Sequence, residues 1–143
     1  MDFRIRPKSD YLHHASWQQL YALTKHWQSD LQFYADEVVF FRNLAGNKLI
    51  WLEKDQNIEA IRIIGNRLTK AASTIAKLDG QFQKHLQHLG EFTKHPNTQG
   101  AETFRLEHST LEDQFTEFVK SIRDLKKEIF DLVEEVTEGE RNS

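Results

Sequence analysis

Histidine is the residue type with the widest chemistry in this chain, and seven histidines are present. The stretch "QFQKHLQHLGEFTKH" carries His85, His88 and His95, and "HSTLE" places His108 four residues before Glu112. Residues three or four apart on a helix project from the same face. His85 with His88, and His108 with Glu112, therefore have the spacing that helical bundles use to present metal ligands.

Three interpretations of these residues are open. His85, His108, Glu112 and His88 could bind zinc or iron through imidazole and carboxylate groups, although the repeated carboxylate motifs of di-iron bundles are missing. Alternatively, one polar layer in an apolar seam fixes the register of two helices, and this structural interpretation is the one we favour. A third role is pH-dependent, because charging two facing imidazoles would push helices apart.

Three long helices are predicted to carry these side chains, because apolar residues recur at alternating spacings of three and four. Pro96 and Gly100 in "KHPNTQG" predict a short loop before the last helix. Gly46 is either a helix end, followed by a short fourth segment near 47–53, or a flaw within a first helix that continues to Glu53. The predicted helices run from His13 or Ser16 to "LAGNK", from Asn57 to Phe92 or Thr93, and from Ala101 to Val136.

Each predicted helix has one continuous apolar seam, which is typical of coiled-coil-like bundles. Folding the second helix back onto the third about the loop places His85 opposite His108, the polar residues of those two seams. The seams consist of His13, Trp17, Leu20, Thr24, Trp27, Leu31, Tyr34, Val38, Phe41 and Ala45; of Ile61, Ile64, Leu68, Ala71, Ile75, Leu78, Phe82, His85, Leu89 and Phe92; and of Ala101, Phe104, His108, Leu111, Phe115, Phe118, Ile122, Leu125, Ile129, Leu132 and Val136.

The register of the first helix has two alternatives. A turn near Trp51 places Trp17 beside the histidine layer, and a turn at 55–57 places Thr24 there. Either residue could donate a third hydrogen bond to the pair.

Three apolar residues of the first helix lie off its seam, namely Phe33, Val39 and Phe40. Three helices cannot bury a helix that is apolar on every side. We therefore expect a homodimer through this helix, with "KLIWLE" folding over the rings as the alternative.

The composition limits the functional classes. A chain of 143 residues fits one domain, 1–143, with frayed termini at 1–12 and 137–143. The net charge of −3 gives no expectation of nucleic-acid binding, and no stretch has the length and hydropathy of a membrane span. The chain contains no cysteine, which excludes disulfides and thiolate chemistry. We expect a cytoplasmic location.

The sequence thus predicts an all-α, antiparallel up-down-up bundle of three long helices that dimerises. Phosphate loops and nucleophile elbows are missing from the sequence, which favours a non-enzymatic interaction or scaffold protein with a helical protein as a further partner. The alternative function is a small metal-binding bundle that uses the histidine-rich end.

Overall fold

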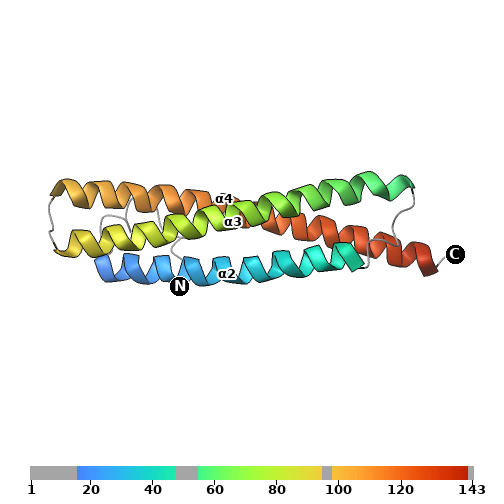
Figure 1. Cartoon of the computed structure of the whole chain (residues 1–143), viewed down its shortest axis with the longest axis horizontal. Coiled ribbons are helices and arrows are strands. Elements are labelled where there is room, and N and C mark those ends of the chain that lie inside the picture. The colour runs from blue at the N-terminus through green and yellow to red at the C-terminus, as the bar shows by residue number, and fades with distance from the viewer. Residues whose placement is uncertain (1–15, 48–54, 95–97, 142–143) are drawn as a thin grey trace. The chain divides into compact units, whose positions relative to one another are not determined.

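The computed structural model describes residues 16–47, 55–94 and 98–141, and all of these except Ser16 are helical. Helix α2 spans Trp17–Asn47, α3 spans Asp55–Lys94 and α4 spans Thr98–Arg141. Figure 1 shows the three helices, and side chains of each contact side chains of the other two. The expected all-α class with three packed helices is confirmed for the described part of the chain.

The helix ends differ from the predicted ones by a few residues. Helix α4 begins at Thr98, so that Gly100 is helical, and it continues past the predicted end at Val136 to Arg141. The prediction took the end of the apolar seam as the end of the helix. A helix, however, is held by backbone hydrogen bonds, and no proline interrupts the polar residues that follow.

The start of α2 is fixed by a reciprocal cap. The backbone N–H of Ser16 donates to Gln19 Oε1 at 2.8 Å, and the backbone N–H of Gln19 donates to the Ser16 hydroxyl at 3.1 Å. These bonds satisfy backbone donors that the first turn of a helix leaves without intrahelical partners. The alternative start at Ser16 is therefore favoured over His13.

Several predictions fall outside the described residues. They concern the terminus 1–12, His13, His14, His95 and the two alternatives for "KLIWLE". Helix α2 passes through Gly46 and is described as far as Asn47.

The predicted seams form the core. In α4, every seam residue from Phe104 to Leu132 is buried, and α2 and α3 bury most of theirs. Thr24, His85 and His108 are the buried polar side chains of the described part, each with an exposed fraction of 0%. The spacing of apolar residues therefore identified the buried face of each helix correctly.

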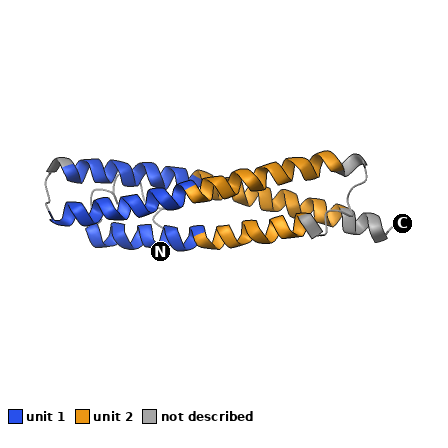
Figure 2. Cartoon of the chain, in the orientation of Figure 1, with its two compact units in different colours: residues 1–31, 77–116 blue, residues 32–76, 117–143 orange. Residues whose placement is uncertain are grey.

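The chain divides into two compact units, shown in Figure 2, and each helix contributes to both. Unit 1 contains residues 1–31 and 77–116, and unit 2 contains residues 32–76 and 117–143. The prediction of a single domain stays a prediction.

Aromatic contacts and edge ion pairs connect the helices within unit 2. Between α2 and α4, the rings of Tyr34 and Phe118 lie 5.8 Å apart, and Lys126 Nζ lies 2.7 Å from Glu37 Oε2. Between α3 and α4, Arg67 pairs with Glu128. Both ion pairs keep contact with solvent at the edge of the core and so contribute little, which leaves the apolar seam to supply most of the stability of this unit.

Glycines inside α3 give a test of helix energetics. A Cβ built on Gly65 or on Gly80 meets nothing within 4 Å. Because glycine costs about 0.5–1 kcal/mol relative to alanine in a helix interior, Gly80→Ala and Gly65→Ala should each raise the free energy of unfolding by about that amount. Urea unfolding followed by circular dichroism measures the change. The reverse substitution Ala76→Gly is the matched control and should lower stability, whereas a destabilising Gly80→Ala would contradict the prediction.

A buried histidine pair as the candidate functional site

The two polar residues of the α3 and α4 seams meet inside unit 1. His85 Nε2 lies 3.0 Å from His108 Nδ1, and both side chains have an exposed fraction of 0%. This contact confirms the facing of His85 and His108 that the seams predict. It also means that each imidazole supplies a hydrogen-bond partner to the other in an otherwise apolar layer.

A carboxylate extends the pair toward the surface. Glu107 Oε1 lies 2.5 Å from His85 Nδ1, and His88 Nδ1 lies 2.9 Å from both Glu107 oxygens. An ionised carboxylate accepts only, so His85 donates from Nδ1 and accepts at Nε2 when it is neutral. His108 then donates from Nδ1. The result is a directed chain of hydrogen bonds from His108 through His85 to Glu107.

Aromatic rings close the two sides of the pair. Phe104 stacks on His85 with ring centres 4.2 Å apart and an angle of 6° between the planes. Trp27 of α2 stacks on His108 at 4.6 Å and 27°. The site is therefore built from all three helices, and the rings keep water away from both faces.

The contribution of α2 follows the second of the two sequence-based registers, but without the predicted hydrogen bond to the histidines. Trp17 packs against Phe92 at 4.6 Å and against Phe104 at 5.6 Å, so the register that places it beside the histidines is wrong. Leu20 packs with Leu89 and Phe104, and Trp27 contacts Phe82 and Phe115. Buried Thr24 lies between these two levels, so the register that places it at the histidine layer is confirmed. Its hydroxyl, however, donates to the Leu20 carbonyl at 2.8 Å. The wide indole face of Trp27 covers the layer, where the sequence analysis expected a hydrogen-bond donor.

Burial and the carboxylate act in opposite directions on the pKa of His85. Burial lowers this pKa, and the hydrogen bond and charge of Glu107 offset the effect in part, so the net pKa lies below the ordinary value of 6.5. For Glu107, burial works to raise the pKa, but the hydrogen bonds and charges of His85 and His88 outweigh it. The net pKa of Glu107 lies below 4.5. A neutral His85 beside an ionised Glu107 is the favoured state near pH 7.

The predicted metal-site residues are brought together only in part. His85 and His108 touch, His88 joins them through Glu107, and half-buried Glu112 follows His108 by one turn of α4. Within the described ranges, no group of three or more histidine, cysteine, aspartate or glutamate side chains has the geometry to hold a metal ion. The pair is therefore arranged as a hydrogen-bonded contact.

Glu107 is the site residue that the sequence analysis missed. It immediately precedes His108 and so lies at the edge of the seam, where a charge can reach across to the neighbouring helix. That position next to a polar seam residue is the signal that could have found it. The remaining described histidine, His26, lies on the surface with its Nε2 3.4 Å from Asp30 Oδ2.

A groove of about 460 Å³ between α3 and α4 opens beside Glu107. Its apolar wall includes Leu106, whose exposed fraction is 70%. Gln81 also lines it, and in the described part of the chain Gln81 Oε1 is buried without a hydrogen-bond partner. The groove brings solvent next to the carboxylate, while the two imidazoles behind it remain buried.

Comparisons with protein-family models, with curated proteins and with solved structures found no match for this chain. Among the described residues, no helix combines the length and the apolar character that crossing a membrane requires.

The histidine pair predicts a pH dependence of stability. The folded state keeps His85 neutral below pH 6.5, where the unfolded chain takes up the proton, so the free energy of unfolding should fall as the pH drops below about 6.5. The lowered pKa of Glu107 predicts a further fall below about 4.5, because the unfolded carboxylate is protonated first. Urea unfolding between pH 7.5 and pH 4 measures both declines.

Two substitutions separate these declines. Glu107→Gln keeps an acceptor for His85 and removes the charge, so the decline below pH 4.5 should shrink while the one that starts near pH 6.5 remains. His85→Leu should remove the latter. His26→Gln is the matched control, because it removes a surface histidine and leaves the buried pair intact. A decline near pH 6.5 that persists in His85→Leu would contradict the assignment.

Proposed function

We propose that this protein is a non-enzymatic scaffold or interaction module that works by self-association. In this proposal the chain forms an antiparallel up-down-up bundle, and two copies join through α2 into a larger bundle. The module acts in the cytoplasm, and a helical protein is its further partner. The histidine layer serves the bundle as a register-fixing contact.

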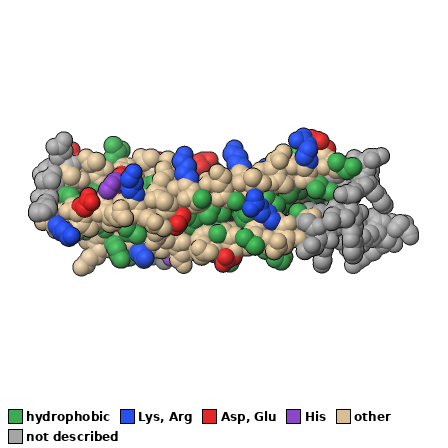
Figure 3. All heavy atoms as spheres, viewed as in Figure 1, with side chains coloured by type: hydrophobic (Ala, Val, Ile, Leu, Met, Phe, Trp, Pro, Cys, Tyr) green, Lys and Arg blue, Asp and Glu red, His purple; other side chains and the backbone are tan. Residues whose placement is uncertain are grey.

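One observation carries this proposal, which is the exposure of large aromatic side chains on unit 2. Phe33 and Phe40 of α2 have exposed fractions of 60% and 59%, and Phe130 of α4 has 53%. On the face drawn in Figure 3, hydrophobic side chains also reach the surface between the charged ones. Clustered exposed apolar side chains on a soluble protein mark interaction sites, whereas single exposed residues are ordinary.

The exposed rings of Phe33 and Phe40 each contact the ring of the residue that follows. The ring of Phe33 meets that of Tyr34 edge to face at 5.9 Å, and the ring of Phe40 meets that of buried Phe41 at 5.3 Å. A partner that covers them would bury the aromatic surface that they form, which favours association.

The oligomeric state tests this function. Light scattering after size exclusion should give the mass of a dimer for the unaltered chain and of a monomer for Phe33→Lys with Phe40→Lys, because two charges would be buried in the interface. The helical circular dichroism signal should stay unchanged. Ile63→Lys on α3, where Ile63 is 45% exposed, is the matched control and should remain dimeric. A strictly monomeric unaltered protein would refute the proposal.

Metal binding is the second candidate, because His85, His108 and Glu107 supply the ligand types that zinc and iron take and lie in contact, although they would have to rearrange to hold an ion. If it holds, protein purified without a histidine tag should contain about one zinc or iron ion per chain by elemental analysis. His85→Ala and His108→Ala should each remove the ion, because each deletes one ligand. Substoichiometric metal that survives both substitutions would eliminate this candidate.

A further inference from the structure

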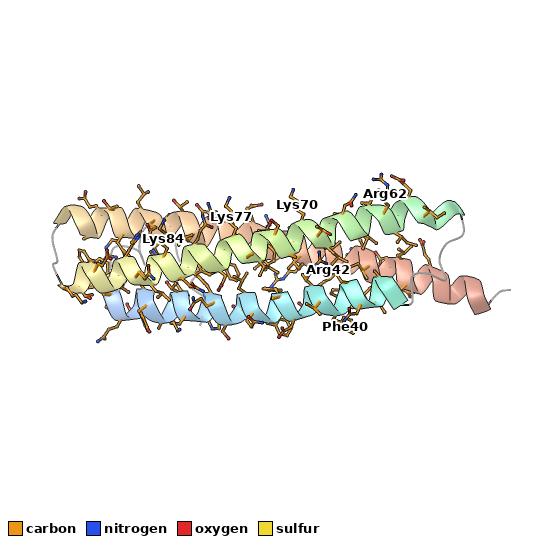
Figure 4. All side chains as sticks on the ribbon, viewed as in Figure 1. Phe40, Arg42, Arg62, Lys70, Lys77 and Lys84 are labelled. Atoms are coloured by element: carbon orange, nitrogen blue, oxygen red, sulfur yellow. The ribbon has the colours of Figure 1, made fainter. Side chains whose placement is uncertain are left out.

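The inference concerns how two copies meet and rests on the proposed self-association. Phe33 and Phe40 are seven residues apart, which is close to two full turns, so they form one ridge along α2. In Figure 4, Phe40 points away from the other two helices. Side chains flank this ridge on both sides, and their charges differ between the two sides.

Helix α4 lies on the first side of the ridge. Glu37 of α2 reaches Lys126, and Phe41 packs against Phe130 with ring centres 5.7 Å apart. Further around α4 from Lys126, on the side away from the core, lie the exposed residues Arg123, Lys127 and Phe130. They follow one another at spacings of four and three. They form one stripe on the outer face of α4, with two positive charges followed by an aromatic ring, and exposed Glu134 lies one turn further along.

An acidic and an apolar residue lie on the second side. At about 100° per residue, Asp36 lies about 50° from the ridge, and Val39 lies about 110° from it in the same direction, away from α4. Both are exposed, and Val39 has an exposed fraction of 56%. Asp36 accepts a hydrogen bond from Gln32 at 3.2 Å. Phe33, Val39 and Phe40, expected as one interface, therefore occupy two faces of α2.

The charged residues of the two sides lie at the same level of unit 2. Within unit 2, later residues of α2 contact later residues of α4: Tyr34 contacts Phe118, and Phe41 contacts Phe130. These two contacts define two levels along the helices. Asp36 lies between these levels on α2, and Arg123 lies between them on α4. Val39 precedes Phe41 by two residues and so lies close to the level of the contact between Phe41 and Phe130.

We propose that a second copy of this chain covers the ridge with its own α2 parallel to the first, related by a two-fold axis that runs along the helices. Phe33 then meets Phe33 of the second copy, and Phe40 meets Phe40. The same axis brings α4 of each copy to the Asp36 side of the other. Asp36 faces Arg123 and Lys127 across the interface, and Val39 faces Phe130.

Charge disfavours the other two-fold arrangement. An axis perpendicular to the helices would make the two α2 helices antiparallel and leave both α4 helices on one side of the interface. Asp36 would then face Asp36, and the basic stripes would face each other. Like charges across an interface cost free energy, whereas unlike charges set the register of association. The parallel arrangement places unlike charges opposite each other on both sides.

Cysteine crosslinking tests the arrangement, because the chain contains no cysteine of its own. A disulfide needs Cα atoms within about 7 Å, so only residues next to the two-fold axis bond to their own copies. Phe33→Cys and Phe40→Cys should each form a crosslinked dimer under mild oxidation. Lys70→Cys, on the exposed surface of α3, is the matched control and should stay uncrosslinked.

The outcomes separate this inference from the proposed function. Crosslinking only in a mixture of the Phe33→Cys and Phe40→Cys proteins would show an antiparallel dimer and overturn the parallel one. A dimeric unaltered chain without any crosslink would place another segment or another face over the ridge, and would also overturn it. A monomeric unaltered chain would overturn both proposals.

Charge reversal gives a second test that spares the aromatic ridge. Asp36→Arg and Arg123→Asp should each raise the dimer dissociation constant at least about fivefold, since each disrupts two symmetric contacts. The doubly substituted chain should regain most of the affinity, because it restores unlike charges on both sides. Lys70→Asp is the control and should leave the constant unchanged. Additive losses in the double variant would contradict the pairing of Asp36 with Arg123.

Discussion

The hydrogen bond between His85 and His108 is the constraint on which the packing of unit 1 depends. Leucine, isoleucine and phenylalanine layers can slide past one another at modest cost, because most apolar pairs are acceptable neighbours. A slip of one layer would leave two buried imidazoles against apolar side chains, and each unpaired polar group costs about 1–3 kcal/mol. The pair therefore selects one register of α3 and α4, at the expense of a layer that would be more stable if it were wholly apolar.

Unit 2 is held by a different balance of interactions. Its layers are apolar, and the ion pairs Glu37 with Lys126 and Arg67 with Glu128 lie at their edges. Phe33, Phe40 and Phe130 stay exposed when the seams are buried. In a bundle of three helices, each helix has only two neighbours and can bury only one side. The polar residues of this chain thus lie partly in the core of unit 1, and some of its largest apolar side chains lie on the surface of unit 2. Both departures from ordinary patterning are the places where function is expected.

The sequence allowed the seams to be predicted almost completely, because helical periodicity depends on local spacing alone. His85 and His108 could be placed opposite each other by counting from the short loop around Pro96. Glu107 and Trp27 could not be assigned to the site in the same way. Whether a flanking carboxylate turns toward a histidine, and which ring of α2 covers it, depends on the rotation of each helix and on side-chain rotamers. The end of α4 was misjudged for a related reason, since the apolar seam stops before the helix does.

What the sequence determined by itself is the all-α class, the buried face of each helix and the polar layer of His85 and His108, because these follow from residue spacing. The tertiary structure decided that Trp27 of α2 covers that layer, that hydrogen bonds extend it to Glu107 and His88, and that the chain divides into two compact units. It also showed that α4 lies on the side of the Phe33 and Phe40 ridge opposite to Val39. The physical reason is that one helix specifies its own periodicity, whereas its rotation against two neighbours is set by the packing of all three.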